Sequence, residues 1–188
     1  MRDVRVKELM SQARTTFDSA IQDAEVLLAH FDSNNKNPPP DNTEVLKRAG
    51  LVMALTAWET YVEDLVQEVV SARLEQSKDE HLTQLVRGRL ESDLRRFHNP
   101  NSDKTRQLLI DYLNIDVTPF WKWGGYEPDS AMAKLNELIA VRGDAVHRSK
   151  PLPAGSPARH LVKRDDLDKA ITFLKHLVDA TERAVSNR

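Results

Sequence analysis

Residues 131–147 read AMAKLNELIAVRGDAVH. The apolar positions of this stretch, at steps of four and three, are Ala131, Leu135 and Leu138. Such spacing is typical of the buried stripe of an α-helix, which we expect from about residue 129 to 146. The next position of the stripe is Arg142, a charged side chain that is costly to bury without a partner or a ligand. Five residues later comes His147, whose side chain type titrates near neutral pH. The sequence therefore predicts a helix that carries a functional pair, Arg142 and His147.

Three further long segments repeat this spacing. In residues 4–31 the apolar positions are Val6, Met10, Ala13, Phe17, Ala20, Ala24, Leu27 and Phe31. In the segment that begins near Asp41 or Asn42 they are Leu51, Leu55, Trp58, Val62, Leu65 and Val69. In the last segment, which begins at Asp165 or Asp166, they are Leu167, Ile171, Leu174, Val178, Thr181 and Val185. We therefore predict an all-α fold, an antiparallel up-and-down helical bundle of five to six helices.

Two shorter helices complete the predicted bundle, over residues 81–97 and from Asn101 or Ser102 to Leu113. The stretch 119–128 between them and the motif helix contains two prolines, two glycines and four aromatic residues, so we expect an irregular loop. Its rings either pin the loop onto the bundle, which we favour, or stack on unpaired bases.

Composition limits the function classes. The chain has 188 residues, a net charge of −2 and no cysteine, so thiol catalysis and thiolate metal sites are excluded. No apolar run approaches the ~20 residues of a membrane span. We expect a single cytoplasmic domain over residues 1–188, with an N-terminal helix and proline-rich loop in 1–40 and the core bundle in 41–188. Trp58 and Tyr61 are predicted core anchors, and the acids Glu59, Glu63 and Asp64 are interpreted as a solvated helix face.

Directly after the motif helix, the chain becomes cationic. Residues 147–164 contain no acid, and their cations are Arg148, Lys150, Arg159, Lys163 and Arg164. Prolines and a glycine make this segment an extended loop. In a chain of slightly negative charge it is a candidate RNA-binding patch that attracts phosphate, and the alternative is a basic loop without a ligand.

The pair of Arg142 and His147 suits RNA cleavage. The guanidinium of arginine can donate two parallel hydrogen bonds to a phosphate, and histidine takes up and returns a proton near neutral pH. RNA carries its own nucleophile, the 2′-hydroxyl, so a base and a cation suffice without a metal or other cofactor. The expected products are a 2′,3′-cyclic phosphate and a 5′-hydroxyl, and DNA should resist.

Helix geometry restricts this hypothesis. Five residues on a regular helix turn by ~140° beyond one full turn and rise by ~7.5 Å, so Arg142 and His147 would not share a face. Either the helix is distorted near Gly143, or a second copy of the chain completes the site across a twofold axis. Otherwise Arg142 lines the core and His147 satisfies carbonyls at a helix end.

Arg142-Gly143-Asp144-Ala145-Val146-His147 resembles the R-x4-6-H motif of the HEPN superfamily. Residues 54–65 (ALTAWETYVEDL) and 97–101 (FHNPN) are similar to its RiboL-PSP-HEPN branch, and the resemblance covers about residues 42–185. It implies an all-helical bundle, a homodimer joined near the motif helices, and metal-independent endoribonuclease activity, with Arg142 and His147 of both subunits facing one cleft. Members commonly act as toxins or as effectors in phage defence, sometimes restrained by a partner protein such as an antitoxin.

One position departs from the family pattern. The family usually has a polar residue directly after the arginine, and here it is Gly143, which removes a side-chain hydrogen bond. Asp144 is the candidate replacement. The second hypothesis is therefore a catalytically weak or inactive module that binds RNA or a partner protein. A third, a metal-dependent hydrolase, finds little support, because the six histidines are dispersed without metal-ligand spacing.

Overall fold

The computed structural model describes residues 11–34, 43–147 and 162–186, with the backbone alone at 144–147. Its α-helices are α1 (Gln12–Asn34), α2 (Glu44–Leu74), α3 (Glu80–Leu94), α4 (Ser102–Leu113), α5 (Pro128–His147) and α6 (Arg164–Ser186). A short 3₁₀ helix, η2 (Thr118–Phe120), precedes α5. Within these ranges the only β-type pairing is one bridge, between Trp123 and Tyr126. The prediction of an all-α bundle is confirmed. None of the described helices is long and apolar enough to cross a membrane.

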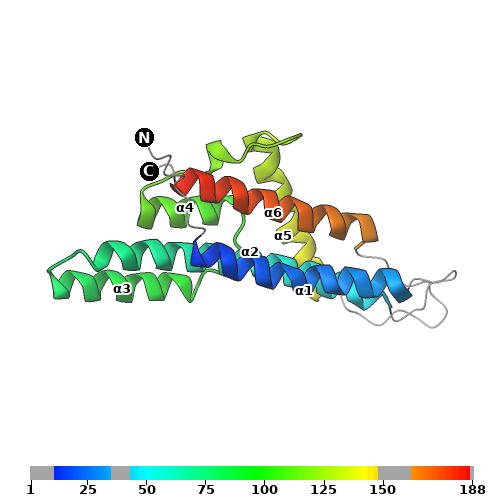
Figure 1. Ribbon diagram of the computed structural model, residues 1–188, viewed down its shortest axis with the longest axis horizontal. Coiled ribbons are helices and arrows are strands. Elements are labelled where there is room, and N and C mark those ends of the chain that lie inside the picture. Colours follow the sequence, from blue (N-terminus) through cyan, green and yellow to red (C-terminus); the bar gives the residue numbers. More distant parts are fainter. Residues whose placement is uncertain (1–10, 35–42, 148–161, 187–188) are drawn as a thin grey trace, which may run out of the picture.

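The helices form two layers around a central α2 (Figure 1). α2 runs antiparallel to α1, and α3 folds back along the far end of α2. α6 lies on the other side, antiparallel to α1, whereas α5 crosses the direction of these helices. Because α2 packs against helices on several sides, it buries residues well beyond its predicted stripe, among them Ala54, Tyr61 and Val66.

The apolar stripe of α1 differs in detail from its prediction. Ile21 and Leu28 are buried, whereas the predicted Ala20 and Leu27 are only partly buried. The predicted positions Val6 and Met10 lie outside the described residues. The stripe shifts because two consecutive steps of four, from Ala13 to Ile21, bring α1 against both α2 and α6.

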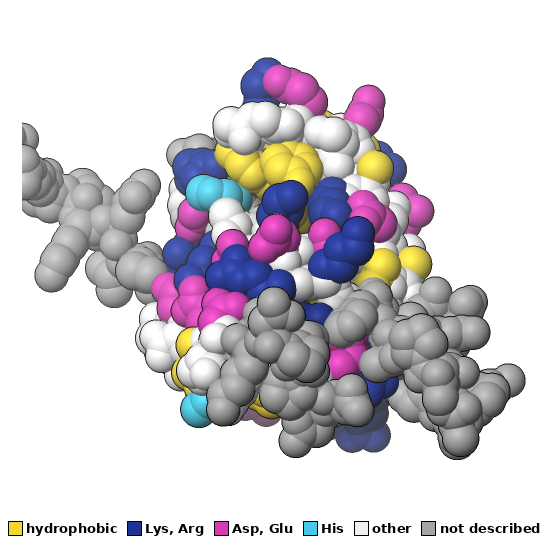
Figure 2. Space-filling view, turned by 90° about the vertical axis from the view of Figure 1, so that its right-hand side faces the viewer, with side chains coloured by type: hydrophobic (Ala, Val, Ile, Leu, Met, Phe, Trp, Pro, Cys, Tyr) yellow, Lys and Arg dark blue, Asp and Glu magenta, His cyan; other side chains and the backbone are white. Residues whose placement is uncertain are grey.

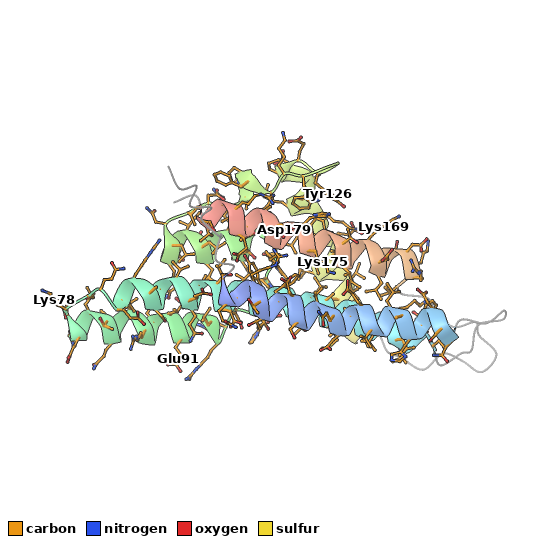
Figure 3. The ribbon with its side chains drawn as sticks, in the orientation of Figure 1. Lys78, Glu91, Tyr126, Lys169, Lys175 and Asp179 are labelled. Atoms are coloured by element: carbon orange, nitrogen blue, oxygen red, sulfur yellow. The ribbon has the colours of Figure 1, made fainter. Side chains whose placement is uncertain are left out.

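Ion pairs join the exposed edges of α1 and α6. Arg14 pairs with Asp179, and Lys175 pairs with Glu25. Figure 3 shows Lys175 and Asp179 on the side of α6 that faces α1. These contacts fix the second layer over α1 and leave α5 to cross beneath α6.

The aromatic loop is held by its rings. Trp121 is fully buried, lies edge-on to Trp58, and donates its indole N–H to Thr181 Oγ1 at 3.0 Å. Trp123 and Tyr126 pack against Phe173 of α6. The favoured interpretation, a loop pinned onto the bundle, therefore holds for Trp121, Trp123 and Tyr126, whereas Phe120 is 52% exposed.

The two shorter helices, α3 and α4, begin close to their predicted first residues. Asn101 caps α4, because its side chain accepts a hydrogen bond from the Lys104 N–H. The apolar residues of α3 are buried only near the end of the helix: Leu90 is buried, whereas Leu82 is 49% exposed. The start of α3 lies beside the end of α2 and beyond the helices of the second layer (Figure 1). The candidate caps Asp41 and Asn42 lie outside the described residues.

Candidate functional site

Arg142 continues the buried stripe of α5 and reaches across to α2. Its Nη1 donates to Glu59 Oε2 at 2.7 Å and to Asn99 Oδ1 at 3.0 Å. Nη2 lies 3.4 Å from Thr56 Oγ1. The Arg142 and Glu59 side chains are only 18% and 14% exposed. Glu59 is therefore the partner that a charged residue in a core stripe requires.

The loop between α3 and α4, residues 95–101, supplies the third side of the site. Asn99 adopts a left-handed backbone, with a φ of 52°, which turns the loop towards Arg142. The next residue, Pro100, accepts a buried hydrogen bond from Trp58 Nε1 at 3.1 Å. Asn136 of α5 then accepts a bond from the Ser102 N–H at 2.9 Å. The loop is therefore tied to both α2 and α5, beside the guanidinium.

His98 brings an imidazole to the same site. Its Nδ1 lies 3.6 Å from Glu59 Oε1, and its side chain is 72% exposed. Its backbone carbonyl accepts a bond from Lys104 Nζ at 2.6 Å. One carboxylate, that of Glu59, thus contacts a guanidinium through one oxygen and faces an imidazole with the other.

Glu63 lies one turn along α2 from Glu59. Burial, followed by the negative charges of Glu59 and Asp64, raises the pKa of Glu63 from 4.5 to about 7, against an opposing effect of His98. Glu63 also lines a hollow of about 700 Å³ between α2 and α3, whose opposite wall includes Arg87 and Arg95. This hollow therefore has both acidic and basic side chains on its walls.

We expect Glu63→Gln to stabilise the fold at about pH 8 and to leave it nearly unchanged at about pH 4. A carboxyl with a raised pKa binds more protons in the folded state, so its contribution to stability falls as the pH rises from 4.5 to about 7. Glutamine removes that loss, which is on the order of 1 kcal/mol because solvent screens a partly exposed group. Urea unfolding at both pH values measures it, and an equal effect at both would contradict it.

The end of the motif is helical. α5 continues without a break through Gly143 to His147, so the backbone shows no distortion at Gly143. A regular helix turns Arg142 and His147 to different faces. The side chains of Asp144 and His147 lie outside the described residues, and so do Arg148, Lys150 and Arg159.

Gly143 has room for a side chain. Its backbone is helical, and an added Cβ meets no described atom within 4 Å. Because glycine costs about 1 kcal/mol relative to alanine inside a helix, Gly143→Ala should raise the melting temperature by about 2–4 °C in a chain of this size. Gly50→Ala is the control: there the new Cβ would lie 2.8 Å from Leu167 Cδ2, so the gain should be smaller or reversed. A lower melting temperature for Gly143→Ala would show that this position needs its backbone freedom.

Two of the cations after the motif, Lys163 and Arg164, lie in the described part of the chain, and their surroundings differ. Lys163 is exposed. Arg164 binds Asp32 at 2.8 Å and Asp168 at 3.3 Å, so the expectation of an uncompensated cation is wrong at Arg164. At this end of the molecule, Figure 2 shows Lys and Arg side chains interspersed with Asp and Glu among the described residues.

Sequence reasoning missed the residues that hold Arg142. Glu59 was predicted to lie on a solvated face, and it is instead the buried partner of Arg142. Asn99, His98 and Thr56 were assigned no role. The available signal was that these four residues lie in the two stretches, 54–65 and 97–101, that carry the family resemblance. Among the described residues, no group of three or more His, Asp or Glu side chains is placed to hold a metal ion.

Comparison with known proteins places this site in a family. A family model described as RiboL-PSP-HEPN matches residues 19–187, nearly the whole chain. The chain belongs to the RiboL-PSP-HEPN family. HEPN domains are associated in general with RNase activity, so this one is a nuclease-like or RNA-related module. No curated protein and no solved structure matched the chain. In this HEPN domain, Arg142 of the motif contacts both of the other stretches that resemble the family. It binds Glu59 of residues 54–65 and Asn99 of residues 97–101.

Proposed function

We propose that this HEPN protein is a metal-independent endoribonuclease that cleaves RNA through attack of the 2′-hydroxyl on the adjacent phosphate. The observation that carries the proposal is the fixed Arg142, whose guanidinium is held by Glu59 at 2.7 Å and by Asn99 at 3.0 Å. A guanidinium that is positioned in advance stabilises the charge that develops on the phosphate without reorganisation. His147 is the proposed base for the 2′-hydroxyl.

Arg142 retains binding capacity in spite of its ion pair. Nη1 is engaged by Glu59 and Asn99, whereas the contact of Nη2 with Thr56 is long, at 3.4 Å. A guanidinium has five N–H donors, so donors remain for a phosphate oxygen. Glu59 lowers the net charge of the site, and the proposed RNA-binding residues Arg148, Lys150, Arg159 and Lys163 would offset it. Asp144 is proposed to support the pair in place of the usual polar residue.

The proposed active form is a homodimer. Because α5 is helical through Gly143, a single copy of a regular helix directs Arg142 and His147 to different faces. A twofold axis near the ends of two α5 helices brings residues of both copies to one cleft. The continuous backbone of α5 does not favour the other route to a shared site, a helix distorted near Gly143, and so supports the dimer over it.

The test is cleavage of single-stranded RNA in the presence of a chelator. We expect products that end in a 2′,3′-cyclic phosphate, and no cleavage of the same sequence as DNA or with 2′-O-methyl groups. End-labelled oligonucleotides resolved on gels distinguish these cases. DNA cleavage, or RNA cleavage that the chelator abolishes, would overturn the proposal.

The second candidate is a non-catalytic module that binds RNA or a partner protein. The ion pair of Arg142 with Glu59 and the glycine at position 143 favour it. A protein that binds RNA in a filter or fluorescence assay, yet leaves every RNA intact between about pH 6 and pH 8, would support this candidate over the nuclease.

The proposed biological setting is a toxin or a phage-defence effector restrained by a partner protein. Induced expression in a bacterial host should then arrest growth, and the Arg142→Ala variant should not. Equal growth with both proteins would count against a toxic role.

A further inference from the structure

We propose that His98 is the general acid of this site and protonates the 5′-oxygen that leaves when the RNA strand breaks. The inference deepens the proposed nuclease function and rests on it. Its basis is the placement of the imidazole: Glu59 faces His98 Nδ1 with one oxygen at 3.6 Å and binds Arg142 Nη1 with the other at 2.7 Å. Imidazole and guanidinium therefore lie beside one partly buried carboxylate.

The backbone that carries His98 is held on both sides. The His98 carbonyl accepts a bond from Lys104 Nζ, at 2.6 Å. The Asn99 side chain binds Arg142, and the Pro100 carbonyl accepts the indole N–H of Trp58. Functional groups on such supported segments keep the geometry that catalysis needs. Yet the His98 side chain is 72% exposed, so a substrate can reach it. An imidazole that served only the fold would not require this access.

The chemistry requires two proton transfers. The 2′-oxygen forms a bond to phosphorus as its proton passes to a base, and the bond from phosphorus to the 5′-oxygen breaks as that oxygen gains a proton. His147 accounts for the first transfer in the proposed mechanism. A carboxylate beside Nδ1 fixes the orientation of an imidazole and leaves Nε2 for the substrate. Glu59 is placed to do this for His98, and Arg142 holds the phosphate between the two events.

The groups that face His98 come from three helices. They are Glu59 and Glu63 of α2, Lys104 of α4 through the His98 carbonyl, and Arg142 of α5 through Glu59.

The experiment compares two substrates with the full-length protein. One is ordinary RNA, and the other is RNA in which sulfur replaces the bridging 5′-oxygen at one position. A thiolate leaves without a proton, so the second substrate does not need an acid. His98→Ala should slow the cleavage of ordinary RNA by about 10²–10³-fold in kcat, and that of the sulfur substrate by less than about tenfold. His98→Asn should behave in the same way, and His81→Ala, an exposed histidine on α3, is the matched control.

The possible outcomes separate the role of His98 as general acid from the proposed nuclease function. If the wild type cleaves RNA and His98→Ala retains its rate, the role of His98 is refuted and the nuclease stands. If both substrates slow equally, or only KM rises, His98 binds RNA rather than donating a proton, and the inference fails. If the wild type cleaves neither substrate, the proposed function itself fails.

Discussion

Replacing His147 with alanine is expected to lower RNA cleavage by roughly 10²–10⁴-fold, the range that a positioned acid–base group contributes. His147 is the last residue of α5, and alanine is compatible with a helix at that position. The loss should therefore appear in kcat, with helix content and oligomeric state unchanged. Initial rates on single-stranded RNA measure the first effect, and circular dichroism with light scattering measures the second.

The control for this variant is an exposed histidine on another helix, His176. His176→Ala changes an imidazole on α6 that packs beside Trp123, away from Arg142. It should cleave RNA at the wild-type rate. A His147→Ala protein that does the same would refute the nuclease assignment, whereas a variant that loses both activity and oligomeric state would assign His147 to the interface.

Trp58→Ala is expected to have the largest effect on stability, a loss of about 3–5 kcal/mol in the free energy of unfolding. Trp58 is fully buried, packs against Tyr61 and Trp121, and donates its indole N–H to the Pro100 carbonyl. Alanine leaves a cavity in the core and a buried carbonyl without its partner. Urea unfolding followed by circular dichroism measures the change.

Two further variants separate the contributions of Trp58. Trp58→Phe keeps a ring but removes the N–H, so it should cost less than alanine, about 1–3 kcal/mol. Phe120→Ala truncates an aromatic side chain that is 52% exposed, and it should change stability by no more than about 0.5 kcal/mol. If Trp58→Ala cost as little as Phe120→Ala, the central position of Trp58 would be disproved.

Much of the fold follows from apolar spacing. The stripe of Ala131, Leu135 and Leu138 is buried, as predicted, and so are Leu51, Leu55 and Trp58 on α2. Apolar spacing did not predict burial correctly where burial depends on a packing neighbour that cannot be identified from the sequence. Leu82 belongs to the apolar side of α3, and it stays half exposed because the second layer ends before it.

The candidate site was predictable in part. The position of Arg142 in a core stripe showed that it needs a partner, and the structure supplies Glu59. The sequence could not predict that this partner is Glu59, because Arg142 and Glu59 are 83 positions apart. In addition, an acid on an amphipathic helix usually faces solvent. His98 and Asn99 depend in turn on a left-handed turn that brings the loop against α5.

Trp58 and Glu59 are consecutive residues of α2. Trp58 anchors the loop that carries His98 to the core, and Glu59 forms the ion pair with Arg142. Heat inactivation and global melting should consequently follow a single curve, since the site around Arg142 has no support that is independent of the hydrophobic core. Under the proposed toxic role, a genetic screen for variants that no longer arrest growth would then return many substitutions deep inside the bundle besides those of the motif.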